Sequence, residues 1–192
     1  MKKKIVGALS GLLISSAVTA ATETYQIDNK HSFANFNIRQ IVAKTTGSFT
    51  DVTGVIKIDA EHLEKSSLQA KIGVTSVNIG LAKRDAHIQK SDYLDALNFG
   101  EITFVSKSVK AFSATEGTMT GDFMMHGVTK TISMPFKVLG FGADPWRGQR
   151  AGFEATTKIK VSDYGFGWMK EANAPVSDDI EVTLFIEAIK AK

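Results

Sequence analysis

The chain has 192 residues, of which 43% are hydrophobic and 22% are charged, and it contains no cysteine. The lack of cysteine excludes disulfide bonds, a catalytic thiol and cysteine-ligated zinc. The formal net charge of +3 comes from Lys2, Lys3 and Lys4: without them, the 23 basic residues fall to 20 and equal the 20 acidic ones. A neutral chain without a basic run lacks the electrostatic footprint of a nucleic-acid-binding protein, so we expect no nucleic-acid partner.

The first 21 residues have the layout of a secretory signal peptide. Three lysines precede the apolar run 5–18, and small residues follow that run. We expect cleavage near Ala20 or Ala21 and a periplasmic location. The apolar run is shorter than the roughly 20 residues that cross a bilayer, so we expect no stable membrane span in the mature form. Residues 22–192 contain no linker or low-complexity segment and are expected to form one domain.

From residue 22 onward, apolar and polar residues alternate with a period of two, which is typical of strands with one buried face. Turn-forming residues separate the runs. About eight strands with short connections predict an all-β antiparallel meander, which usually closes into a barrel or folds into a sandwich. Sequential pairing favours an eight-stranded barrel, whose interior is filled by side chains or holds one small ligand. The clearest runs are 24–28, 67–74, 119–125, 132–138 and 182–188.

The 12 phenylalanines and 6 methionines of the chain are a second feature of these strands, because many occupy the inward phase of the alternation. Such adaptable apolar side chains suit the wall of a cavity for a flexible apolar guest. They are equally common in a plain hydrophobic core, which composition alone favours. The candidate wall residues are Phe36, Phe49, Phe104, Phe123, Met125, Met134 and Phe136.

One stretch breaks the β pattern at about residues 81–97, where the spacing becomes helical. On a helix, Leu81 and Ile88 share one face, which we expect to turn inward. The opposite face offers a cationic site for an anionic head group, with a histidine that titrates near neutral pH. A solvated outer face is the simpler interpretation. The residues of this opposite face are Lys83, His87 and Lys90, and Arg84 next to Asp85 is expected to form a local ion pair.

Two further loops carry aromatic or charged residues. In the stretch 144–150, Trp146 and Arg150 suit a clamp for a phosphate or carboxylate beside an apolar chain, although a hairpin whose tryptophan caps one end of the barrel is the simpler interpretation. In the stretch 163–168, glycine alternates with aromatic residues. This pattern indicates a bulged strand end more than a mobile lid.

Enzyme signatures are weak throughout the chain. The four histidines, at 31, 62, 87 and 126, show no paired metal-ligand spacing. The chain has no GxSxG elbow, P-loop or dinucleotide-binding GxGxxG motif. We therefore expect no catalytic residues, no metal site and no cofactor.

Six stretches spread over almost the whole mature chain combine these features in a fixed order. They are His31-Ser-Phe with Phe36 and Ile38, Gly47-Ser-Phe with Gly54, the segment Ser76 to Phe104, the segment Gly121 to Lys130, the segment Asp144 to Glu154, and Ser162-Asp-Tyr-Gly-Phe. In this order they resemble the YceI-like family, exported proteins with a lipocalin-like barrel that bind polyisoprenoids or other long-chain lipids. The resemblance implies an eight-stranded antiparallel barrel with an apolar tunnel and the helical stretch at one end.

The chain departs from the common family pattern at two positions. Gln40 stands where a histidine often follows the first long strand, and Gly100 stands where a proline usually precedes the strand that begins at Glu101. The first change removes a histidine that could contact a polar head group, and the second is expected to loosen the join between helix and strand.

We therefore predict a soluble periplasmic protein that holds a long-chain isoprenoid or fatty-acyl lipid in an apolar cavity, for transport or storage. The alternatives are a small outer-membrane β-barrel, which shares the strand period and the signal peptide, and a lipid-modifying enzyme. A homodimer is left open. The predicted ligand-binding residues are Phe36, Phe49, Phe104, Phe123, Met134 and Phe136 in the wall and Arg84, His87, Trp146 and Arg150 at the mouth or head-group end.

Overall fold

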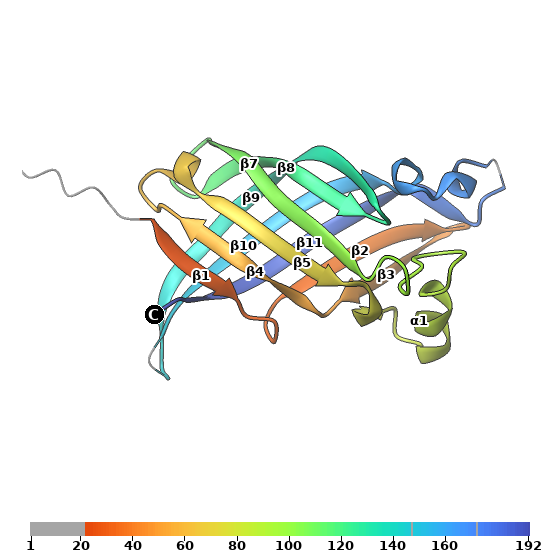
Figure 1. Ribbon diagram of the computed structural model, residues 1–192, viewed down its shortest axis with the longest axis horizontal. Helices are drawn as coiled ribbons and strands as arrows, with labels where there is room; N and C mark the ends of the chain where they lie inside the picture. Colours follow the sequence, from red (N-terminus) through yellow and green to blue (C-terminus); the bar gives the residue numbers. More distant parts are fainter. Residues whose placement is uncertain (1–21, 147, 172) are drawn as a thin grey trace, which may run out of the picture.

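The computed structural model describes residues 22–146, 148–171 and 173–192, so the predicted signal peptide lies outside the described residues. One antiparallel sheet of eleven segments dominates this part of the chain (Figure 1). Its segments are β1 (Glu23–Ile27), β2 (Phe33–Gln40), β3 (Ala43–Phe49), β4 (Val52–Ile58), β5 (Ser67–Gly73), β6 (Val77–Asn78), β7 (Glu101–Ala111), β8 (Glu116–Met125), β9 (Val128–Asp144), β10 (Gly148–Lys160) and β11 (Val176–Lys190). The helical elements are α1 (Ala82–Ile88) and the 3₁₀ turns η1 (Leu63–Lys65), η2 (Val74–Ser76), η3 (Val161–Tyr164) and η4 (Gly167–Lys170).

The sheet closes into a barrel. Its segments follow the order β1-β4-β5-β7-β8-β9-β10-β11, and β1 then pairs back with β11. The other three segments continue strands already in this ring, because β2 extends the line of β1 along β11, β3 extends β4, and β6 extends β5. The prediction of a closed, eight-stranded antiparallel barrel is confirmed, with three of the eight strands interrupted.

The alternation of side chains gives the barrel an apolar interior and a polar exterior. Along β8, residues 117, 119, 121, 123 and 125 are buried and the residues between them are half-buried. The outer face carries lysine–carboxylate pairs between neighbouring strands, such as Lys71 with Glu101 at 3.0 Å and Lys137 with Glu116 at 3.1 Å. The period of two therefore sorts the residues as the sequence predicts.

The helical segment lies at one end of the barrel (Figure 1). It contains a single helix of seven residues, α1, followed by turns. Leu81 is 52% exposed, so the prediction that it turns inward is wrong. The reason is that Leu81 has an extended backbone, with φ of −147°, and precedes the helix instead of lying on its face. Among the described residues, no helix has the length and hydropathy of a transmembrane segment.

Several contacts fix this end segment to the barrel. The Asp85 carboxylate accepts a hydrogen bond of 2.7 Å from the Ile79 backbone N–H. The ion pair between Arg84 and Asp85 that the sequence predicts is not formed. Next to β7, the Gly100 carbonyl accepts the Val74 N–H at 2.9 Å, which fixes the join between helix and strand. The His126 ring lies between Phe99 and Phe166, and its centroid is 4.3 Å from that of Phe99 and 4.8 Å from that of Phe166.

The stretch 161–170 contains two 3₁₀ turns rather than the bulged strand end predicted from its glycines.

The three strand interruptions lie beside one another and are joined by polar side chains. Asn29, between β1 and β2, accepts the Val52 N–H at 2.8 Å and donates to the Asp51 carboxylate at 3.0 Å. Thr50, between β3 and β4, donates its N–H to the Ser76 hydroxyl in η2 at 3.1 Å. These bonds satisfy backbone groups that leave the ladder where the strands are interrupted.

A buried serine replaces strand pairing where β1 ends. Ser32 is fully buried, and its hydroxyl donates to the Glu187 carbonyl and accepts the Glu187 N–H, both at 3.1 Å. The side chain thereby supplies the acceptor that a paired backbone carbonyl would give the Glu187 N–H, while the Asp28 N–H also donates to the Glu187 carbonyl at 2.8 Å.

An arginine joins the same region from outside the barrel. Arg150 donates to the carboxylates of Asp28 and Asp144, each at 2.8 Å, and to the carboxylate of Glu187. Burial raises the pKa of Asp28, but hydrogen bonds from His31 and Arg150 outweigh this effect and lower that pKa to about 2. Arg150 thus links the β1–β2 connection, the β9–β10 hairpin and β11.

Ser32→Ala tests the role of the buried hydroxyl. We expect the free energy of unfolding to fall by about 1–3 kcal/mol, because the Glu187 N–H is left buried without an acceptor. Urea unfolding followed by far-UV circular dichroism measures the change. Ser108→Ala, at an exposed position in β7, is the control and should leave stability within about 0.5 kcal/mol of wild type. An equally small effect of Ser32→Ala would contradict the assigned role.

Arg150→Met tests the ionic link and its pH dependence. We expect the urea midpoint at pH 7 to fall, and to fall further than in Lys158→Met, where only an exposed pair with Glu181 is lost. The native pKa of Asp28 lies below its unfolded value of roughly 4, so its contribution to stability is present above that pH and is lost toward pH 2. The difference between wild type and Arg150→Met should therefore shrink from about pH 5 to pH 2. A difference that stays constant with pH would attribute the loss to packing instead of charge.

Candidate functional site

The barrel encloses a cavity of about 660 Å³. This volume falls within the roughly 300–1,000 Å³ of typical small-molecule sites. Its wall is built from inward-facing side chains of most strands of the barrel and is dominated by aliphatic and aromatic carbon. The alternation that buries one face of each strand therefore leaves open space inside the barrel instead of filling it.

The predicted wall residues come together in this cavity from β2, β3, β7, β8 and β9. Two of the rings, those of Phe36 and Phe49, lie side by side with centroids 5.7 Å apart. The described wall includes Phe36, Phe49, Phe104, Phe123, Met125, Met134 and Phe136. Branched aliphatic residues, which were not among the predicted wall residues, complete the wall. They occupy the same inward phase and include Ile56, Leu68, Ile72, Ile102, Ile180 and Leu184.

Several polar residues of the lining lie at the α1 end. Arg84 and His87 both line the cavity and are exposed to solvent, so the cavity reaches the outside beside α1. The His87 Nε2 atom lies 3.2 Å from the hydroxyl of Tyr93, another lining residue. Tyr93 was not predicted from the sequence, because it follows the helix in an irregular turn where no period applies. These three side chains offer hydrogen-bonding groups to whatever part of a ligand remains at the opening.

Other segments complete the frame of the opening. Gln40, at the end of β2, lines the cavity and accepts a hydrogen bond of 3.0 Å from the Thr45 hydroxyl. This position therefore remains polar although the histidine common in the family pattern is absent. Met169, from η4, and Pro175, from the loop before β11, also line the cavity.

Trp146 and Arg150 are not among the residues that line the cavity. The connection between β9 and β10 lies at the end of the barrel away from α1 (Figure 1). Trp146 is 81% exposed there, so it does not cap the barrel. Arg150 is engaged by three carboxylates on the outside. The structure thus brings eight of the ten predicted ligand-binding residues to the cavity and separates these two from it.

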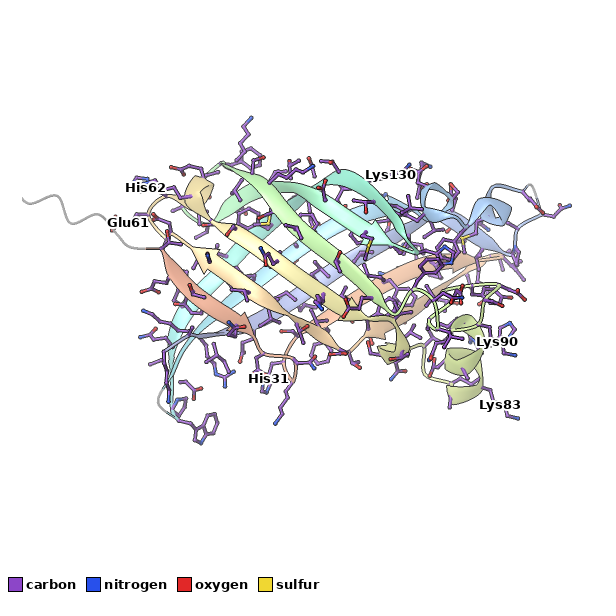
Figure 2. All side chains as sticks on the ribbon, viewed as in Figure 1. His31, Glu61, His62, Lys83, Lys90 and Lys130 are labelled. Carbon is purple, nitrogen blue, oxygen red and sulfur yellow. The ribbon has the colours of Figure 1, made fainter. Side chains whose placement is uncertain are left out.

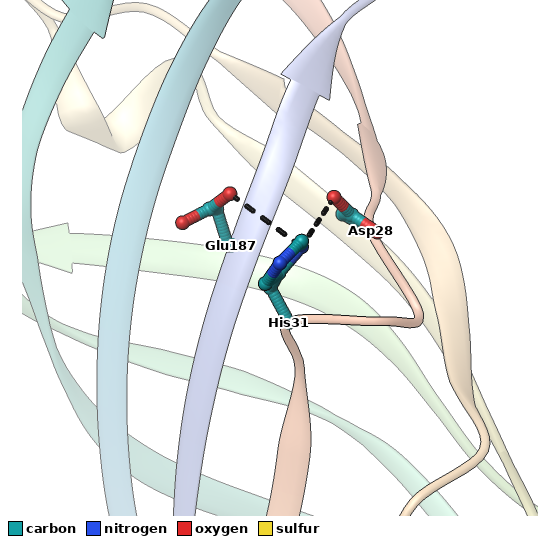
Figure 3. Close-up of side chains that lie close together, drawn as sticks. All are labelled: Asp28, His31 and Glu187. Carbon is teal, nitrogen blue, oxygen red and sulfur yellow. Dashed lines mark hydrogen bonds and ion pairs between the residues drawn. The ribbon is translucent and has the colours of Figure 1, made fainter. Parts of the chain in front are cut away.

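Three of the side chains near Arg150 have the composition of a metal site. Ligand atoms of Asp28, His31 and Glu187 lie within 4.8 Å of one another, and the His31 Nδ1 atom is 2.9 Å from Asp28 Oδ2 (Figure 3). Arg150 donates to the same oxygen atoms of Asp28 and Glu187 that face the His31 ring. A metal ion would have to displace this guanidinium, so we assign the cluster a structural role.

Comparison with known proteins agrees with this architecture. The family model of the YceI-like domain matches residues 25–188. The chain is 34% identical to protein YceI of Escherichia coli O157:H7 over 195 residues, which cover all of both chains. The crystal structure of BcnA from Burkholderia cenocepacia superposes with a TM-score of 0.75 at 23% identity, covering 84% of this chain and 98% of that one.

A polyisoprenoid binding domain from Saccharophagus degradans, implicated in plant cell wall breakdown, also superposes. Its TM-score is 0.64 at 18% identity, covering 87% of this chain and 98% of that one. At such identities these two structures show the fold alone. The match of the family model, together with the full-length relative from Escherichia coli, shows that the chain belongs to the YceI-like family.

Proposed function

We propose that this protein is a soluble periplasmic binding protein that holds a long-chain isoprenoid or fatty-acyl lipid, for transport or storage. One observation carries the proposal: an apolar cavity of about 660 Å³ that reaches solvent beside Arg84 and His87. A flexible hydrocarbon chain fits the wall, and a polar head group fits the opening. The role is one of binding rather than catalysis, with the polar lining at the opening holding the head group in place.

Burial of the chain supplies the driving force. Each CH₂ group removed from water contributes about 0.8 kcal/mol. Ten such groups contribute roughly 8 kcal/mol before the entropic costs of association are subtracted. Because this force has no direction, selectivity among lipids depends on chain length and on the head group at the opening.

Other observations support the remaining parts of the proposal. The layout of residues 1–21 supports export to the periplasm. Lysine–carboxylate pairs on the outer face of the sheet favour a soluble barrel over the outer-membrane alternative, which requires an outward apolar band. The Saccharophagus degradans domain, which shares this fold, is described as polyisoprenoid binding, so an isoprenoid is the first long-chain lipid to test.

Ala155→Phe tests the cavity as the binding site. Ala155 lines the cavity from β10, so a benzyl group there fills space that a ligand would occupy. We expect affinity for the fluorescent fatty acid cis-parinaric acid to fall roughly 100-fold, which corresponds to about three or four displaced methylene groups. Fluorescence titration measures the change.

The control is Thr156→Phe, which adds the same group at the exposed neighbouring position. It should leave the affinity within about twofold of wild type, which is under about 0.5 kcal/mol. Native mass spectrometry of the protein recovered from the cells that make it should show a co-purified lipid. Equal binding of the probe by both variants, or recovery of an empty protein that takes up no long-chain lipid, would overturn the proposed function.

A further inference from the structure

Exposed apolar side chains surround the cavity opening. Val42, in the β2–β3 connection, and Leu97, in the segment after α1, are each 94% exposed. Both lie within three residues of positions that line the cavity, namely Gln40 and Leu94. We call the exposed apolar residues of the β2–β3 connection and of the segments on either side of α1 the rim; they are Ile41, Val42, Leu81 and Leu97.

The tip of the β2–β3 connection is held in a fixed and unfavourable conformation. Ile41 has φ of +54°, which a β-branched residue rarely adopts. Its N–H donates to the Pro175 carbonyl at 2.8 Å, and its carbonyl accepts the Arg39 guanidinium at 2.6 Å. These bonds hold a strained turn that directs apolar side chains into water. Strain of this kind is concentrated at functional positions.

Positive charge accompanies the rim. Lys83 and Lys90 project from the α1 end of the molecule, away from the barrel (Figure 2). Lys44, at the start of β3, pairs with Glu181, but four other cations next to the rim form no ion pair with a carboxylate among the described residues. They are Arg39, Lys83, Arg84 and Lys90.

The nearby acids offset most, but not all, of this charge. Asp85 accepts the Ile79 N–H, and Asp95 accepts both hydrogen bonds of the Asn98 amide. Asp92 is exposed in the same segment. Four cations therefore stand against three carboxylates, which leaves these seven side chains with a net charge of +1; local hydrogen bonds hold two of the carboxylates in place.

We propose that the rim docks onto the surface of an anionic lipid bilayer. Apolar tips that enter the interfacial region, flanked by lysine and arginine facing lipid phosphates, are the combination by which peripheral proteins bind such surfaces. A second copy of this chain fits less well, because a symmetric contact would set the four cations against their equivalents. Docking goes beyond the binding of a lipid in the barrel: it places the cavity opening against the membrane, so a chain can pass between them without crossing water.

Vesicle flotation tests the apolar part of the rim. The protein is recovered from the cells that make it, with its N-terminus determined by mass spectrometry, and mixed with vesicles of phosphatidylcholine alone or with one quarter phosphatidylglycerol. We expect wild type to float with the anionic vesicles, and the double variant Val42→Ser/Leu97→Ser to lose this binding at least fivefold. The control, Phe112→Ser/Leu139→Ser, removes side chains that are 63% and 60% exposed away from the rim and should float like wild type.

A second pair of variants tests the charge. Lys83→Gln/Lys90→Gln should bind anionic vesicles at least threefold less and respond less to added salt. Lys57→Gln/Lys65→Gln, which removes two exposed lysines elsewhere on the barrel, should behave like wild type. If wild type does not float, or if the rim variants float as well as their controls, the proposal is overturned.

Two further measurements distinguish membrane docking from a damaged cavity and from contact between copies of the chain. Titration with cis-parinaric acid should give wild-type affinity for every rim variant, so a loss of flotation cannot reflect a failed cavity. Sedimentation velocity identifies the competing occupant. A wild-type dimer that the rim variants dissociate, without vesicle binding by wild type, would overturn the proposal and assign the rim to contact between copies.

Discussion

The pairing of β1 with β11 is the constraint on which the rest of the structure depends. It joins Tyr25, Gln26 and Ile27 to the last residues of β11 and leaves the ring of strands without an edge. In a closed sheet, every second side chain must point into one shared interior. The apolar phase of each strand thereby becomes a continuous wall, and the polar phase becomes the outer surface.

The interruptions of three strands do not weaken this closure, because side chains replace the missing backbone bonds. Asn29 and Ser32 each satisfy two backbone or side-chain partners across the interruptions. Arg150 then joins three separate segments over this region from outside. Asn29, Ser32 and Arg150 are not among the residues that line the cavity, so its wall remains predominantly apolar.

The barrel itself could be predicted from the sequence, because a period of two directly reports which face of a strand is buried. The same period placed Phe104, Phe123 and Met134 in the wall. The period carries no information about the interruptions, since residues such as Asn29 and Ser76 have the composition of ordinary turns. The period also could not place Arg150, because its partner Asp28 lies 122 positions away in the sequence. The local motif around Arg150 therefore suggested a ligand clamp, whereas the structure has an ionic link there.

The position of the opening has a kinetic consequence. The cavity reaches solvent beside a seven-residue helix and irregular turns, whereas the strands themselves form a closed ring of pairing. Short segments with few backbone ladders open locally at much lower free energy than a closed sheet. Exchange of a guest therefore requires only fluctuation of this end segment, so its rate is set independently of global unfolding. A very stable barrel can still release its contents quickly.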